Sequence, residues 1–198
     1  MNDSTFRQAH SALHHAVQFY GSDESLCATV AGFLAEGLIA QQPAIVIATD
    51  AHRALILHHL SGRLIDCQKA VKEGDLVVLD ADAILDLFMV DGRPNEQLFE
   101  VNLSRVIDQL LNGRGGPARA YGEMVDLLWK NGQSDAAIAL EILWNKLALK
   151  YNFALLCGYS IGSFYKQTKQ FEDVCAQHSY VVPESTNVVP FQRRVKSA

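Results

Sequence analysis

Acidic side chains in apolar surroundings are the residues of this chain best suited to chemistry. Glu123 stands between a short apolar run and an apolar helical turn, where a buried carboxylate without a partner would cost several kcal/mol. Glu141 lies in a segment that is apolar on most sides, and Asn145 follows it by one helical turn. We expect these three groups to converge on one pocket, with Trp129 or Trp144 as an apolar wall.

Two further residues complete the predicted contacts to a ligand. Tyr20 ends the first apolar run of the chain, and Cys157 ends the run that begins at Phe153. A thiol at that place would be a soft nucleophile or ligand, or else an inert core residue. The acids also fit structural roles, because Glu123 could cap a helix or form an ion pair. Glu141 could likewise belong to a polar seam between helices.

Short apolar runs alternate with helical patterns along the chain. The runs at 16–19, 44–48, 76–79, 118–121 and 153–157 predict five strands, and 180–182 predicts an edge strand. The fold class is therefore α/β, with three layers, a mostly parallel sheet and helices on both faces. In open parallel sheets, ligands bind beyond the carboxyl ends of the strands. We expect the site at that edge.

Polar residues after the strands also predict helix caps. Ser22 or Asp23 can cap the helix after the first strand, and Asp50 and Asp80 follow the second and third strands as N-caps. As N-caps, both aspartates would accept hydrogen bonds from the first amides of a helix. This structural role accounts for them without a catalytic or ligand-binding function.

Several enzyme classes lack their motifs here. The first strand-to-helix loop, Tyr20 to Ser25, has neither the Gly-rich run nor the Lys that hold phosphates, and its two acids would repel a triphosphate. The sequence contains no G-x-S-x-G and no G-x-G-x-x-G. An ATPase, a dinucleotide enzyme and an α/β-hydrolase are disfavoured, and we expect no cofactor.

The histidines and cysteines show no metal-binding signature by spacing. His10, His14 and His15 form one group, and His52, His58 and His59 form another, but neither has a carboxylate or Cys at the spacing of a known zinc site. The four cysteines include no C-x-x-C pair. The sequence thus predicts free thiols and no metal site.

Composition indicates one domain in a reducing compartment. The 198 residues are 49% apolar and carry a net charge of −5, which gives no overall attraction to nucleic acid or to an anionic membrane. Neither a secretory signal nor a membrane-spanning run is present, so we expect a cytoplasmic protein. Residues 1–13 are expected to be a leader, 14–182 the domain and 183–198 a weakly structured tail.

Five blocks of the sequence resemble the MEDS family of sensory domains from methanogens and methylotrophs. They are His14–Tyr20, Phe33–Leu38, Tyr121–Trp129, Leu140–Asn145 and Leu155–Tyr159. The likeness spans roughly residues 14 to 180, with Gln41-Gln42-Pro43 as a minor departure at a turn. It implies a fold related to RecA-like and circadian-clock ATPases, without a working phosphate-binding loop.

The resemblance also implies a function, namely non-catalytic detection of small organic molecules such as hydrocarbon derivatives. Family members occur beside DNA-binding or histidine-kinase modules, and we expect none in this chain. Its signal would pass to a kinase or transcription regulator, or through its own oligomer. Two alternatives stay open. One is an enzyme with Glu123 or Glu141 as acid-base and Cys157 as nucleophile. The other is an interaction module that uses Ile138, Ile142 and Leu149.

Overall fold

A single parallel sheet forms the centre of the protein. The structure, a computed structural model, describes residues 15–112, 117–165 and 168–184. Within these residues six strands pair in the order β3-β2-β6-β7-β1-β8, and every neighbouring pair is parallel. The strands are β1 (His15–Tyr20), β2 (Ala44–Ala48), β3 (Leu76–Asp80), β6 (Ala118–Gly122), β7 (Phe153–Ser160) and β8 (Tyr180–Val182).

All six predicted strands are present, and β8 lies at an edge as expected. One boundary differs in a way that matters for the site. The prediction ended a strand at Cys157, whereas β7 continues for three more residues to Ser160. All of β1 pairs with β7, and its last residue, Tyr20, lies opposite Ser160. The pairing with β1 therefore extends β7 through Gly158 and places Cys157 inside the strand.

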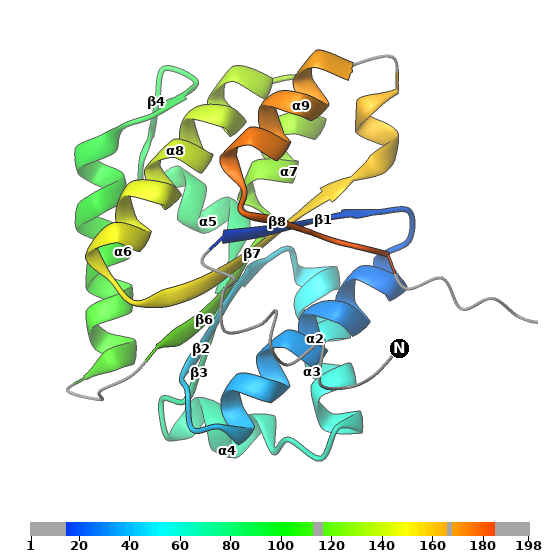
Figure 1. Cartoon of the computed structure of the whole chain (residues 1–198). Coiled ribbons are helices and arrows are strands. Elements are labelled where there is room, and N and C mark those ends of the chain that lie inside the picture. The colour runs from blue at the N-terminus through cyan, green and yellow to red at the C-terminus, as the bar shows by residue number, and fades with distance from the viewer. Residues whose placement is uncertain (1–14, 113–116, 166–167, 185–198) are drawn as a thin grey trace, which may run out of the picture.

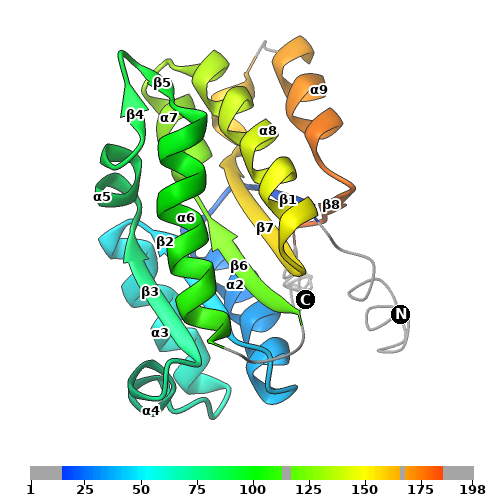
Figure 2. The ribbon, with the colours of Figure 1, turned by 90° about the vertical axis from the view of Figure 1, so that its left-hand side faces the viewer.

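Helices cover both faces of the sheet (Figure 1). One layer contains α2 (Asp23–Ile39), α3 (Asp50–Gly62) and α4 (Cys67–Lys72). The other contains α5 (Ala81–Asp86), α6 (Glu96–Leu111), α7 (Met124–Lys130), α8 (Ser134–Lys150) and α9 (Thr168–Gln177), with the 3-10 turn η1 (Ile161–Phe164) after β7. Figure 2 shows α6 and α8 side by side on this second face. The predicted three-layer α/β fold, of Rossmann or RecA-like type, is confirmed.

A short antiparallel ribbon was not predicted. Strands β4 (Met89–Val90) and β5 (Arg93–Pro94) flank a turn in which both Asp91 and Gly92 have positive φ, 49° and 74°. Two-residue strands are too short for any sequence periodicity to show.

Two hydrophobic cores lie on opposite faces of the sheet. Side chains along a strand alternate between faces, so Val17, Leu155 and Cys157 belong to the core beneath α5 to α9. Ala16, Tyr20 and Leu156 belong to the core beneath α2 and α3. The two cores determine which functional side chains can meet.

The predicted helix caps are confirmed at two of three positions. Ser22 accepts a bond from the amide of Ser25, and Asp80 accepts one from Ala83. Asp50 was wrongly predicted to be an N-cap. Thr49 holds that position without a side-chain bond. Asp50 is the first helical residue, and its carboxylate pairs with Arg53 at 3.1 Å.

Within the described residues, no helix has the length and apolar character to cross a lipid bilayer.

Candidate functional site

Glu123 is at the centre of a buried network at the carboxyl ends of β2 and β6. Its carboxylate lies 2.5 Å from Nδ1 of His52 on α3, and accepts the backbone amide of Thr49 at 2.5 Å. The hydroxyl of Tyr121 donates to the same carboxylate at 3.0 Å. Glu123 occupies the N-cap position of α7 but makes no side-chain cap bond. Its carboxylate instead joins two strands and a neighbouring helix.

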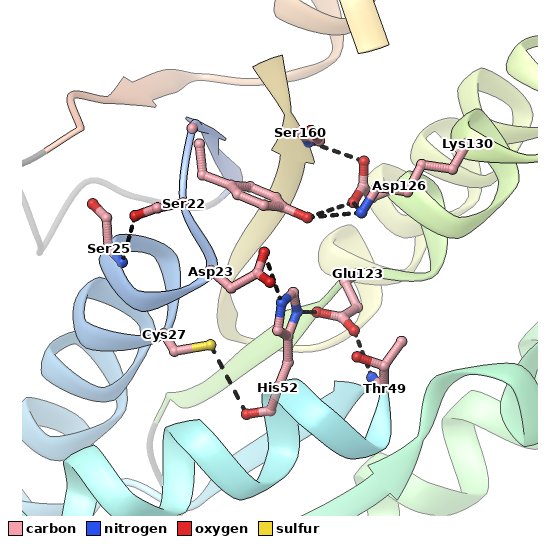
Figure 3. A network of polar contacts seen from close by, with 12 residues as sticks. Ser22, Asp23, Ser25, Cys27, Thr49, His52, Glu123, Asp126, Lys130 and Ser160 are labelled. Atoms are coloured by element: carbon pink, nitrogen blue, oxygen red, sulfur yellow. Dashed lines mark hydrogen bonds and ion pairs between the residues drawn. The ribbon is translucent and has the colours of Figure 1, made fainter. Parts of the chain in front are cut away.

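His52 connects this buried carboxylate to a solvent-exposed one (Figure 3). Its other ring nitrogen, Nε2, lies 3.3 Å from the carboxylate of Asp23 in the first turn of α2. Carboxylates accept hydrogen bonds, and both ring nitrogens donate only in the imidazolium form. His52 is therefore a cation between two anions, and the side chain of Asp23 is 68% exposed.

Asp126, one helical turn after Glu123, holds together the ends of β1 and β7. One carboxylate oxygen accepts the amide of Ser160 at 2.9 Å. The other accepts the hydroxyl of Tyr20 at 2.8 Å and lies 2.8 Å from Nζ of Lys130. The Lys130 side chain is 45% exposed, whereas Asp126 is buried. The carboxyl edge thus has two acids of one segment, each paired with a cation.

Burial and neighbouring charged groups shift the pKa values of the side chains at this edge. Burial alone would raise the pKa of Glu123, but the hydrogen bond and charge of His52 outweigh it and hold that pKa below its usual value. The hydrogen bond to Glu123 raises the pKa of His52 against the opposing effect of burial. Burial, reinforced by nearby carboxylates, raises the pKa values of the Tyr20 and Tyr121 hydroxyls. Both phenols are therefore hydrogen-bond donors at neutral pH.

Glu141 belongs to a second buried cluster, between the sheet and helices α8 and α9. Its carboxylate accepts the Tyr159 hydroxyl at 2.8 Å and lies 3.5 Å from Sγ of Cys157. Two imidazoles complete the cluster. Nε2 of His15 is 3.1 Å from one carboxylate oxygen, and Nε2 of His178 is 3.4 Å from the other.

The two imidazoles favour the ionised form of Glu141. Burial would raise its pKa, but the charge of His178 and the hydrogen bond from His15 hold the pKa below its usual value. Burial and the carboxylate of Glu141 together raise the pKa of the Cys157 thiol well above its usual value. Four groups that can bind a metal, those of His15, Glu141, Cys157 and His178, have ligand atoms within 4.8 Å of one another.

The predicted single pocket is therefore wrong, since the structure divides its residues between two clusters. Tyr20 and Glu123 lie at the carboxyl edge, while Glu141, Asn145 and Cys157 lie in the second cluster. In the pairing of β6 with β7, Cys157 lies opposite Gly122, the residue before Glu123, so the face of the sheet and not the distance along it separates the two side chains. The Cys157 side chain moreover faces the α8 side, in the other core from Tyr121, the partner of Glu123.

Trp144 and Trp129 lie in the core. The Trp144 ring packs edge-on against Phe99 and Phe153, at centroid distances of 5.3 and 6.2 Å. Trp129 packs on Tyr159 and Phe164. Trp144 is on the same helix as Glu141, but its contacts are those of a core residue.

The proposed nucleophile is poorly placed for covalent chemistry. Cys157 has no exposed surface, and a thiol with a raised pKa is protonated and weakly nucleophilic at neutral pH. Each acid has a histidine partner, the kind of group that acid-base chemistry would use. Those histidines are paired with carboxylates, which favours ion-pair roles over proton transfer to a substrate.

Sequence reasoning missed the partners of the acids. The edge network also contains His52, Asp23, Asp126 and Lys130, and the second cluster also contains His15, His178 and Tyr159. The spacing of Asp126 and Lys130 by four residues on a helix was a readable signal of an ion pair. The remaining partners are far apart in sequence. His10 and His14 lie outside the described residues.

Comparison with known proteins identifies the family. No curated protein matches the chain. The MEDS family model, described as methanogen/methylotroph, DcmR sensory domain, matches residues 14–179. This match covers five of the six strands of the sheet, ends just before β8, and includes both clusters. The chain therefore belongs to the MEDS family of sensory domains.

Proposed function

We propose that this sensory domain detects a small, uncharged or cationic organic molecule at the carboxyl edge of its sheet. The observation that supports this most directly is the chain of charges Asp23, His52 and Glu123. It extends from solvent to a buried carboxylate, so a molecule at the surface can act on an ion pair inside the protein.

The charge of the edge selects the class of ligand. Three carboxylates, those of Asp23, Glu123 and Asp126, face the two cations of His52 and Lys130. The net charge of −1 disfavours anions such as phosphates and carboxylic acids. Hydroxyl, amine and carbonyl groups can instead exchange hydrogen bonds with the exposed Asp23 and Lys130 side chains.

A ligand at this place would compete for bonds that now hold loops. A hydroxyl or amine that binds Asp23 would weaken its contact with His52 and release the first turn of α2. The loop before α2 also contacts the segment after β8, because the amide of Gly21 donates to Glu184 at 2.9 Å. Ligand binding would shift the balance of these loop conformations by its difference in affinity for them. A signalling partner, such as a kinase or transcription regulator, would read that change.

The test is calorimetry and thermal unfolding of the protein against small alcohols, amines, aldehydes and ketones. A binding compound should raise the melting temperature of the wild type, and Asp23→Asn and Glu123→Gln should each weaken binding at least tenfold. Asp108→Asn is a matched control, because this exposed aspartate lies near the end of α6 that leads back to the amino side of the sheet. Equal affinity in all four proteins would contradict the proposed site.

A further inference from the structure

The second cluster has the composition and burial of a metal site. His15 comes from β1, Cys157 from β7, Glu141 from α8, and His178 from the link between α9 and β8. Their four potential ligand atoms lie within 4.8 Å of one another. The side chains of His15, Glu141 and His178 are at most 4% exposed. Imidazole, thiolate and carboxylate are the ligands of zinc sites in proteins.

The distances between these atoms resemble those around a tetrahedral ion. Nε2 of His15 is 3.1 Å from Oε2 of Glu141 and 3.3 Å from Sγ of Cys157, and the last two atoms are 3.5 Å apart. With zinc bonds of about 2.0–2.3 Å, ligand atoms of a tetrahedron are about 3.3–3.6 Å apart. Three of the four atoms therefore already form nearly one face of such a tetrahedron. His178, at 3.4 Å from the other oxygen of Glu141, stands beside it.

The surroundings orient both imidazoles as metal ligands. Nδ1 of His178 donates to the Val174 carbonyl at 2.7 Å. Nδ1 of His15 lies 2.9 Å from Oδ1 of Asn145. The orientation of that amide is determined, since its Nδ2 donates to the Gln177 carbonyl at 3.0 Å. Each ring therefore carries a hydrogen on Nδ1 and directs Nε2 into the cluster, and hydrogen bonds of this kind orient histidine ligands at metal sites.

Charge balance favours a divalent ion at this place. A doubly charged cation bound to the Cys157 thiolate and the Glu141 carboxylate gives a site with no net charge, which is the least costly state in a buried environment. Two neutral imidazoles would then direct their Nε2 lone pairs at the ion. Tyr159 still donates to Glu141 and orients it.

We propose that His15, Glu141, Cys157 and His178 form a closed tetrahedral site for Zn²⁺ or a divalent ion of similar softness. All four positions of the tetrahedron would be protein ligands, so the site is structural and not catalytic. It would fasten the α9–β8 link onto β1, β7 and α8. This site is separate from the carboxyl edge and does not depend on the ligand proposed there.

The direct test uses Co²⁺ as a spectroscopic probe of the protein after treatment with a chelator. We expect one equivalent of Co²⁺ to produce tetrahedral visible bands and a near-ultraviolet thiolate-to-cobalt band, and Zn²⁺ to abolish both. The thiolate band should disappear in Cys157→Ser and persist in Cys67→Ser. Cys67 is a suitable control because it lies on α4, in the helical layer on the other side of the sheet.

Thermal unfolding supplies a second, independent readout. At a free Zn²⁺ concentration about a hundred times the dissociation constant, the melting temperature should rise by about 5–10 °C. His178→Gln should lose most of this rise. His58→Gln should keep it, because His58 is exposed on α3 in the opposite layer.

Specific results would overturn the proposal. They are a wild-type protein without a thiolate-to-cobalt band, an unchanged band in Cys157→Ser, or an equal zinc-induced rise in His178→Gln and wild type. Should Cys157→Ser fail to fold, the wild-type spectrum and the His178→Gln titration decide the question. The ligand-binding assays with Asp23→Asn are unaffected by either result.

Discussion

Nδ1 of His52 lies 2.5 Å from Oε2 of Glu123, although the two residues are 71 positions apart in the sequence. Glu123 follows β6 and His52 lies in the first turn of α3, which follows β2. Because β2 and β6 are neighbours in the sheet, both residues reach the same point at its carboxyl edge. This ion pair connects two layers of the fold and makes the edge sensitive to pH.

His52→Gln should lower the free energy of unfolding by about 3–5 kcal/mol, as expected when one partner of a buried ion pair is removed. The His52 pKa is raised above 6.5 in the folded state, so its contribution is complete below pH 6.5 and is lost as the pH rises through the folded value. The Glu123 pKa is lowered below 4.5, so its contribution is lost as the pH falls through the folded value.

Urea unfolding of wild type and His52→Gln from acidic to alkaline pH measures this dependence. The stability difference should be largest between about pH 4.5 and 6.5, the interval between the two unfolded values. His58→Gln is the control, since this histidine is exposed on the same helix. A difference that stays constant with pH would show that His52 contributes by packing alone.

Tyr20→Phe should destabilise the protein by about 1.5–3 kcal/mol, the usual contribution of a hydrogen bond to a charged group. The substitution removes the hydroxyl that donates to Asp126 and leaves the ring in its core. Equilibrium unfolding in urea measures the free energy of unfolding. Tyr180→Phe, at the exposed edge strand β8, should change this free energy little. Similar effects of the two substitutions would contradict the role assigned to the Asp126 network.

Trp144→Ala should lower the free energy of unfolding by about 3–5 kcal/mol, because it removes a buried ring packed on Phe99 and Phe153. Trp144→Phe retains most of this packing and should be milder. Neither effect requires a ligand. Any compound that binds at the carboxyl edge should bind Trp144→Phe with unchanged affinity in calorimetry. A large loss of affinity in this variant would show that Trp144 contributes to the ligand site.

Cys157 should react with iodoacetamide much more slowly than Cys67 in the metal-free protein. It has no exposed surface and a raised pKa, so reaction requires opening of the structure. Cys67 is partly exposed and should react first. Peptide mass spectrometry after timed alkylation distinguishes the two sites. Fast labelling of Cys157 in the folded protein would revive the enzyme hypothesis.

An association surface on α8 is a further prediction. Leu149 is 91% exposed and Ile142 is 41% exposed, whereas Ile138 packs partly against the core. If α8 mediates dimer formation, the mass from light scattering should rise with concentration and Leu149→Gln should abolish the rise. A constant monomer mass would exclude this surface as a dimer contact under those conditions.

Local sequence patterns determined the elements of this fold. The apolar run Ala44–Ala48 is a strand buried on both faces, and Ser22 and Asp80 cap helices as their positions predicted. These features depend on residues within a few positions of one another, such as hydrophobic periodicity and the first unpaired amides of a helix. The alternation of strands and helices was likewise sufficient to predict a three-layer α/β fold.

Only the tertiary structure decided which side chains meet. His15 and Cys157 are 142 positions apart, and they meet because β1 pairs with β7 in a register that places both on one face. A shift of one residue would move either side chain to the opposite face. The same alternation places Tyr121, which donates to Glu123, on the opposite face of the sheet from Cys157 and Tyr159, which contact Glu141. Sequence identified the acids, while strand order and register determined their partners.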